Sequence, residues 1–164
     1  MNNSCFINFP ILETEHLTLR EINRGDYQNL EEIIYYGSYS DSDLTVDDIV
    51  QKIKTGYDNH ESMNWGIILN GELIGTCGYY RGFKNNTGEI GYIMREKYRR
   101  QGYMAEAVEA ALDFGFNSME LECITGFTND TNTPSYALLT KFGFIKTKDL
   151  VDRKYRKYEK LKPK

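Results

Sequence analysis

The order of hydrophobic and polar residues predicts a strand and then two helices in the first third of the chain. Residues 15–22 alternate between apolar and polar side chains, which is typical of a half-buried strand. Arg24-Gly25-Asp26 then supplies a turn and a helix cap. Apolar residues recur every three or four positions over 26–37 and again over 46–57, so both ranges are predicted to be helices.

A hairpin is predicted in the middle of the chain. Asn70-Gly71 supplies the two positive φ angles of a type I′ turn, and it separates two apolar runs, Trp65–Leu69 and Glu72–Tyr80. A second turn-rich segment, 84–88, leads to a third apolar run, Glu89–Arg95. We therefore expect three strands in an antiparallel meander.

The pattern changes to helix, strand and helix after the third strand. Ala105, Val108, Leu112 and Phe116 stand at helical spacing, and a β-rich run follows over 123–128. The next segment predicts a second helix.

That helix is expected over 133–142. Pro134 suits a first helical turn, and Gly143 suits the position just after the last one. Either Asn132 or Thr133 can cap its start. Residues 145–161 then predict one or two final strands, so the fold class is α+β, a mixed sheet with helices packed against it.

Composition limits the function classes. A length of 164 residues suits a single domain over 1–164 with a core of its own. The net charge of −4 argues against nucleic-acid binding and against an anionic membrane surface. No apolar run approaches a membrane span, and the first residues lack a secretory signal pattern. Three cysteines without CxxC spacing fit a cytoplasmic location, and two distant histidines give little support for a metal site.

The loop directly before the third helix carries the most specific chemistry. Arg99, Arg100, Gln101 and Gly102 precede a helix start, where backbone N–H groups and the helix dipole favour an anion. Such a start can hold a phosphate or pyrophosphate, and a glycine lets the backbone approach it closely. The alternative is that Gly102 only forms a turn and that the arginines are solvated.

Several short motifs occur in an order that resembles one enzyme family. They are Leu12-Glu-Thr-Glu-His-Leu-Thr-Leu-Arg20, Leu73-Ile-Gly75, Glu89-Ile-Gly-Tyr92, Gly102-Tyr-Met-Ala-Glu-Ala107, Asn132-Thr-Pro-Ser135 and Lys141-Phe-Gly-Phe144. Together they resemble the GNAT superfamily of N-acetyltransferases, and in particular the branch with the ribosomal-protein alanine N-acetyltransferases. The resemblance runs from about residue 11 to about residue 160. It implies a mostly antiparallel central sheet flanked by helices.

The resemblance also implies acetyl-CoA as cosubstrate, with no metal. In the family, the pantetheine arm lies between two splayed strands, which match 89–95 and 123–129 here. The loop pattern reads Arg99, Gly102 and Met104, where Met104 departs from the family's small residue. The residues expected to bind the coenzyme are Ile93, Met94, Arg95, Arg99, Arg100, Gln101, Gly102, Tyr103, Met104, Ala105 and Asn132.

The catalytic expectations rest on two residues. The resemblance places Ser135 near the sulfur, where it is expected to donate a hydrogen bond to the departing thiolate or to protonate it through relayed water. Many relatives use a tyrosine as this acid, and the matching position here is Leu139. Glu89 is the best single candidate for the base that takes the amine proton. It is at least as consistent with a solvated strand carboxylate. Phe127 stands where some relatives carry a glutamate base.

The predicted function is acetyl transfer from acetyl-CoA to a primary amine by direct attack on the thioester. The acceptor would be a protein N-terminus or a small amine. An acidic, aromatic stretch is compatible either with a site for a cationic amine or with a flexible loop; it comprises Tyr35, Tyr36, Tyr39, Asp41 and Asp43. The alternative is a non-catalytic acyl-CoA-binding module. The final strand is also compatible with a homodimer.

Overall fold

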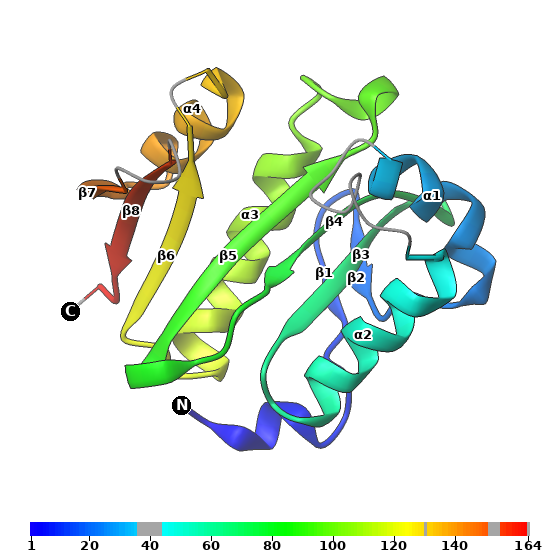
Figure 1. Cartoon of the computed structure of the whole chain (residues 1–164), viewed down its shortest axis with the longest axis horizontal. Coiled ribbons are helices and arrows are strands. Elements are labelled where there is room, and N and C mark those ends of the chain that lie inside the picture. The colour runs from blue at the N-terminus through cyan, green and yellow to red at the C-terminus, as the bar shows by residue number, and fades with distance from the viewer. Residues whose placement is uncertain (36–43, 130, 151–154, 164) are drawn as a thin grey trace.

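The computed structural model describes residues 1–35, 44–129, 131–150 and 155–163. Within them, eight strands form one sheet in the order β1-β2-β3-β4-β5-β6-β8-β7 (Figure 1). Every neighbouring pair is antiparallel except β5 and β6, which run parallel. The strands are β1 (Leu12–Glu13), β2 (Thr18–Arg20), β3 (Met63–Leu69), β4 (Glu72–Tyr79), β5 (Thr87–Met94), β6 (Cys123–Thr128), β7 (Ile145–Leu150) and β8 (Tyr155–Leu161).

Helices cover both faces of this sheet. The α-helices are α1 (Tyr27–Tyr35), α2 (Val46–Asp58), α3 (Tyr103–Asp113) and α4 (Thr133–Lys141). Short 3-10 turns η1 (Asn3–Phe6), η2 (Arg24–Asp26), η3 (Lys84–Asn86) and η4 (Glu96–Tyr98) and the π-turn η5 (Phe114–Ser118) connect the larger elements. None of the helices in the described part of the chain is long and apolar enough to cross a membrane.

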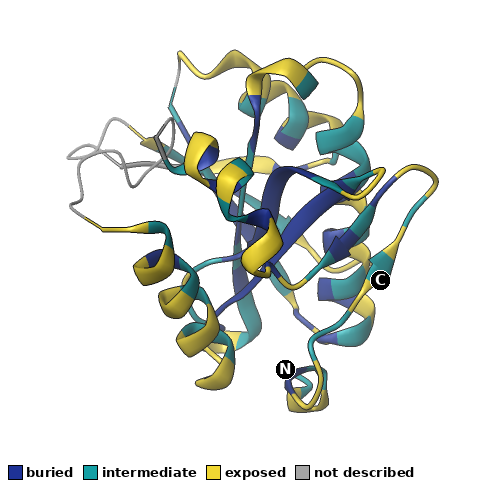
Figure 2. Cartoon of the chain, turned by 90° about the vertical axis from the view of Figure 1, so that its right-hand side faces the viewer, coloured by how far each residue is buried: buried dark blue, intermediate teal, exposed yellow. Residues whose placement is uncertain are grey.

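Two apolar clusters hold the layers together. The larger one joins the sheet to α3 and α4, and its centre is Trp65, whose ring meets that of Phe114 edge-on at 5.5 Å. The smaller cluster joins the sheet to α1 through Leu30 and Ile33, with α2 packed beside it. Figure 2 shows the central strands as the buried layer and the outer sides of the helices as exposed. Burial of these apolar side chains is the main force that stabilises the arrangement.

The predicted α+β fold is confirmed, and so is the hairpin at Asn70-Gly71. Both residues have positive φ, 50° and 83°, as a type I′ turn requires. The strand predicted over 15–22 is wrong at both ends, because β2 covers only Thr18–Arg20. Residues 14–17 form a tight turn between β1 and β2, in which the Thr14 N–H donates to the Leu17 carbonyl at 2.9 Å.

The last helix ends as its sequence predicts. Gly143 has a φ of 75°, and its N–H donates to the Thr140 carbonyl at 2.9 Å. The Phe144 N–H donates to the Leu139 carbonyl at 3.0 Å, which completes a Schellman motif. This cap fixes the point at which the chain leaves α4 for β7.

The parallel pair β5–β6 is only partly joined. The two strands pair at Thr87 with Cys123, at Gly88 with Ile124 and at Glu89 with Thr125. β5 then continues to Met94 and β6 to Thr128 without further pairing between them. Figure 1 shows the two strands diverging toward the start of α4. The result is a gap in the middle of an otherwise continuous sheet.

Candidate active site

The edge of β5 that faces the gap presents backbone groups of alternate residues. On the other edge, the Glu89 carbonyl accepts from the Tyr80 N–H at 3.0 Å, and the Arg95 N–H donates to the Ile74 carbonyl at 2.9 Å. Backbone groups alternate between the two edges of a strand, so those of Tyr92 and Met94 point toward β6. Beyond Glu89 no strand pairs with this edge among the described residues.

The loop before α3 presents a row of backbone donors. Gly102 and Arg100 have positive φ, 91° and 62°, and α3 begins at Tyr103 without a side-chain cap. The Glu106 N–H, which donates to the Gly102 carbonyl at 3.1 Å, is the first of this helix to find a backbone acceptor. The N–H groups of residues 100–105 have no acceptor within the described ranges. A Cβ on Gly102 would meet no protein atom within 4 Å, so the donors face open space.

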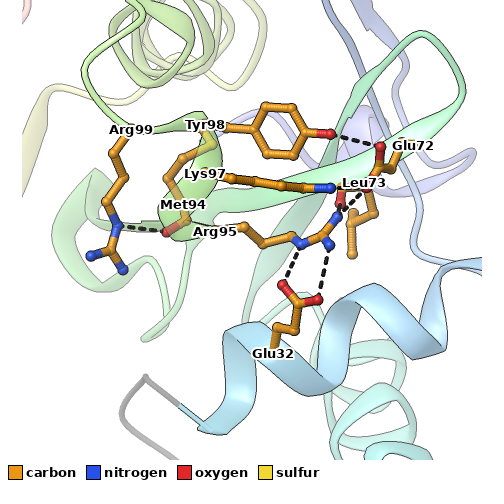
Figure 3. A network of polar contacts seen from close by, with 8 residues as sticks. All are labelled: Glu32, Glu72, Leu73, Met94, Arg95, Lys97, Tyr98 and Arg99. Atoms are coloured by element: carbon orange, nitrogen blue, oxygen red, sulfur yellow. Dashed lines mark hydrogen bonds and ion pairs between the residues drawn. The ribbon is translucent and has the colours of Figure 1, made fainter.

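Some side chains of this loop make hydrogen bonds to the neighbouring backbone, and others are exposed to solvent. Arg99 Nε donates to the Met94 carbonyl at 3.0 Å and holds the loop against the end of β5 (Figure 3). Gln101 Nε2 donates to the Lys97 carbonyl of η4 at 2.8 Å. Arg99 and Arg100 are exposed, so their charge lies beside the open donors. Backbone N–H groups, a helix N-terminus and two guanidinium groups together fit a pyrophosphate.

Arg95 lies at the end of β5, but its side chain points away from the gap and bonds to α1 and β4. Its guanidinium is buried and bonds to both carboxylate oxygens of Glu32, at 2.8 and 3.0 Å, and to Glu72 (Figure 3). Its backbone N–H is paired with β4, and its carbonyl accepts from the Tyr98 N–H at 3.0 Å. The backbone of Ile93 likewise lies in the β4 register. Of Ile93, Met94 and Arg95, the three residues that the sequence predicts along the pantetheine arm, Met94 is the one whose backbone N–H faces the gap.

Ser135 and Tyr92 meet across the gap. Ser135 lies in the first turn of α4, and its N–H donates to the Asn132 side-chain oxygen at 3.3 Å, which makes Asn132 the N-cap. The Tyr92 hydroxyl lies 3.0 Å from Ser135 Oγ. Burial raises the pKa of Tyr92 to about 12. Tyr92 was not expected in the site, although strand alternation already places it on the same face as Ile90 and Met94.

Glu89 projects from the opposite face of β5, because it is three residues from Tyr92. Its carboxylate lies 3.3 Å from Arg81 and is half-buried. Burial raises its pKa, and the charges of Arg81 and Lys157 oppose that shift. The structure thus brings Ser135 to Tyr92 but not to Glu89. Tyr92 and Ser135 therefore flank the gap, whereas Glu89 lies where β5 and β6 are still paired.

Two positions that relatives use in catalysis are apolar here. Leu139 is 2% exposed, and a Cβ on Gly126 would lie only 2.9 Å from Leu139 Cδ2, so this side chain belongs to the core under β6. Tyr136 points away from the gap, with its ring 6.0 Å from that of Tyr158. Phe127 is half-buried on β6. Neither α4 nor β6 therefore supplies the usual acid or base.

A hollow of about 400 Å³ lies beside the end of β5, on the α1 side. Its lining residues are Glu32, Ile33, Ile93, Met94, Arg95, Glu96, Lys97 and Arg99. A second hollow, of about 290 Å³, lies between α3 and the end of β8. The predicted acceptor stretch, Tyr36, Tyr39, Asp41 and Asp43, falls outside the described residues, and Tyr35 ends α1.

Among the described residues, no group of three His, Cys, Asp or Glu side chains is placed to hold a metal ion. Cys5, Cys77 and Cys123 are free thiols. His16 contacts Glu106 with its Nδ1 at 3.0 Å, and His60 stacks on Phe6 at 4.6 Å, so both histidines have structural contacts.

Residues 16–145 match the family of the acetyltransferase (GNAT) domain. The chain belongs to the GNAT acetyltransferase family. It is therefore an N-acetyltransferase of that family, as its motifs predicted. YoaA of Bacillus subtilis (strain 168), an uncharacterized N-acetyltransferase, is 32% identical over an alignment of 149 positions that covers 84% of this chain and 84% of YoaA.

Solved structures of GNAT acetyltransferases share the fold. A GNAT-family acetyltransferase from Bacillus anthracis is 26% identical, with a TM-score of 0.74 over 93% of this chain and 99% of that one. RimL, a ribosomal-protein alpha-N-acetyltransferase solved in complex with coenzyme A, has a TM-score of 0.80 at 15% identity, over 93% of this chain and 98% of RimL. The GNAT fold with a mixed, mostly antiparallel sheet is thereby confirmed.

Proposed function

We propose that this GNAT acetyltransferase moves an acetyl group from acetyl-CoA to a primary amine, which attacks the thioester directly. The observation that supports this most strongly is the gap between β5 and β6. It combines a free strand edge, a helix start with open N–H donors at one end, and a hydroxyl pair at its side. A linear molecule with a pyrophosphate at one end and a thioester at the other fits this arrangement.

The loop before α3 would hold the pyrophosphate. The backbone N–H groups of residues 100–105 would donate to it, and the last three of these residues, Tyr103, Met104 and Ala105, begin the helix. The guanidinium groups of Arg99 and Arg100 would add positive charge. Asn132 would contact the coenzyme from the start of α4.

The pantetheine arm would lie along β5. The N–H of Met94 faces the gap and would donate to the oxygen of the thioester carbonyl as that oxygen becomes negative. Ile93 and Arg95 would flank the arm, with their own backbone N–H groups directed at β4. A fixed backbone donor of this kind stabilises the developing charge without having to reorient.

Proton transfer would be divided between the two faces. An ammonium has no lone pair, so the amine must first lose a proton, and Glu89 is the proposed acceptor. Its raised pKa brings the carboxylate closer in basicity to the group it must deprotonate. On the other face, Ser135 would donate a hydrogen bond to the thiolate that leaves when the carbon–sulfur bond breaks.

The acceptor would enter on the α1 side. The hollow beside Ile93 and Met94 opens there, and Glu96 contributes a carboxylate to its lining. Arg95, Lys97 and Arg99 line the same hollow, so its charge does not select for a cation, and a protein N-terminus or a small amine would approach the thioester through it. RimL acts on a protein N-terminus, as its name states.

Release of free thiol from acetyl-CoA tests this function. The chain is incubated with ribosomal-protein N-terminal peptides, polyamines and aminoglycosides, and mass spectrometry identifies the amine that gains an acetyl group. We expect turnover with at least one amine class. Coenzyme binding without turnover for any of them would contradict the proposal and favour a non-catalytic acyl-CoA-binding module.

We also propose one domain over 1–164, a cytoplasmic location and a homodimer. The three free thiols support a reducing compartment. Among the described residues β7 is the last strand of the sheet and carries Ile145, which is 71% exposed, and this supports pairing of that edge with a second copy. Light scattering that finds a monomer at micromolar concentration would contradict the dimer.

A further inference from the structure

Tyr92 bridges the gap between β5 and α4. Its hydroxyl lies 3.0 Å from Ser135 Oγ and 3.4 Å from the Ser135 carbonyl oxygen. Its ring is partly buried and packs against the larger apolar cluster. This packing and the contact with Ser135 place the phenol oxygen at the first turn of α4.

Either oxygen of the Tyr92–Ser135 contact could donate, and the single phenolic hydrogen has two acceptors in reach, Ser135 Oγ at 3.0 Å and the Ser135 carbonyl at 3.4 Å. The proposed reaction requires Tyr92 to donate to the nearer of the two, Oγ. A serine hydroxyl has one hydrogen to donate and two lone pairs that accept. If Ser135 donated to Tyr92, it would have no hydrogen left for a leaving sulfur. If Tyr92 donates to Ser135 Oγ, the serine hydrogen stays available. Burial raises the pKa of Tyr92 to about 12, so the phenol keeps its hydrogen at neutral pH.

The backbone of Ser135 is also fixed. Its N–H is bonded to the Asn132 cap at 3.3 Å, and α4 is held at its other end by the motif at Gly143. With the backbone fixed, the remaining freedom of Ser135 is rotation of its hydroxyl group. A donor at Oγ limits that rotation and makes the serine a better donor in turn, because hydrogen bonds in a chain polarise one another.

We propose that Tyr92 is a positioning residue that donates its phenolic hydrogen to Ser135 Oγ and so directs the serine hydroxyl hydrogen at the leaving sulfur. No proton leaves Tyr92, and no bond to it forms or breaks. The inference rests on the proposed acetyl transfer and on the role of Ser135 in it.

The test is a cycle of Tyr92→Phe, Ser135→Ala and the double variant, assayed with acetyl-CoA and the best amine. Phenylalanine keeps the ring and removes only the hydroxyl. We expect Tyr92→Phe to lower kcat by about threefold to tenfold, the range of one hydrogen bond, with little change in KM for acetyl-CoA. In the Ser135→Ala background, removal of the hydroxyl should then cause no further loss.

A second readout separates positioning from a structural role. Acetyl-seleno-coenzyme A keeps the nucleotide handle, and its selenol is a better leaving group than the thiol. The deficit of Tyr92→Phe should shrink with this donor, because a selenolate needs less stabilisation. Tyr79→Phe is the matched control. It removes a buried hydroxyl that donates to the Ala111 carbonyl of α3 at 2.8 Å, whereas Ser135 lies on α4. It should lower the melting temperature without altering the ratio of the two donors.

Three outcomes would overturn the inference while leaving acetyl transfer intact. They are wild-type kcat in Tyr92→Phe, an equal loss in the Ser135→Ala background, or an undiminished loss with the selenoester. A wild-type chain that turns over no amine would instead contradict the proposed function itself, so the two failures are distinguishable.

Discussion

At the residue scale, Gly102 matters both for the backbone conformation of the loop and for the space that a ligand would occupy. Its φ of 91° disfavours any L side chain, and a Cβ would project into open space at the row of donors. We predict that Gly102→Ala lowers the free energy of unfolding by about 1 kcal/mol. Gly102→Glu should abolish acetyl-CoA binding in titration calorimetry, because it adds bulk and negative charge where phosphates would lie.

Gly71→Ala is the matched control for Gly102→Ala. Gly71 has a φ of 83°, also with open space at Cβ, but lies in the β3–β4 turn. Gly71→Ala should cost a similar amount of stability and leave coenzyme affinity unchanged. Unchanged affinity in Gly102→Glu would remove this loop from the binding site.

Glu89 gives a prediction about pH. Burial raises its pKa above the ordinary value for glutamate, and Arg81 counteracts the shift. A base works only when ionised, so kcat/KM should fall as the pH drops through this raised pKa. Arg81→Ala removes a charge that lowers the pKa, so the midpoint of the acid limb should move to higher pH. Measurement of kcat/KM against pH checks the direction.

The matching variant for that profile is Glu89→Gln, which should remove the limb together with most of the activity. An acid limb that persists unchanged in Glu89→Gln would assign the base to another group.

At the scale of elements, α4 carries Ser135 and depends on its cap. Asn132→Ala removes the side chain that accepts from the Ser135 N–H and should cost about 1 kcal/mol of unfolding free energy. It should also lower kcat, because the first turn of α4 positions Ser135. Thr45→Ala removes the equivalent cap of α2 and should reduce stability alone. Equal activity losses in both variants would show that helix stability, and not this position, sets the rate.

Patterns among neighbouring residues predicted most helices and strands. Features that depend on contacts between residues distant in sequence were not predicted. The Asn70-Gly71 turn, α2 and the cap at Gly143 follow from residues close together in sequence. The short β1–β2 turn escaped prediction because Glu106, 92 residues from Thr14, accepts a hydrogen bond from its hydroxyl. The splay between β5 and β6 likewise depends on register across the sheet, so Tyr92 could not be placed beside Ser135 from local pattern alone.

On the whole-molecule scale, Arg95 joins α1 to β4 and β5. Its partners are Glu32 of α1 and Glu72 of β4, and Tyr98 and Lys97 also bond to Glu72. The hydrogen bonds from Tyr98, Lys97 and Arg95 lower the pKa of Glu72 from 4.5 to about 2. The network thus links the hollow beside β5 to the core of the sheet.

This network predicts how stability changes in acid. A carboxyl with a lowered pKa stabilises the fold fully above its unfolded pKa, and that contribution is lost as the pH falls from about 4.5 toward 2. Glu72→Gln should flatten the dependence of the unfolding free energy on pH over that range. Glu31→Gln, an exposed change on α1, should leave it unaltered. Parallel curves for wild type and Glu72→Gln would contradict the assignment.

Hydrogen–deuterium exchange with and without acetyl-CoA tests the central claim most directly, because it reports where the coenzyme lies. We predict protection of the backbone amides of 100–105 and of Tyr92 and Met94 on β5, with no change in the β3–β4 turn. Protection confined to the second hollow, between α3 and the end of β8, or no protection at saturating acetyl-CoA, would contradict the placement of the coenzyme in the gap between β5 and β6.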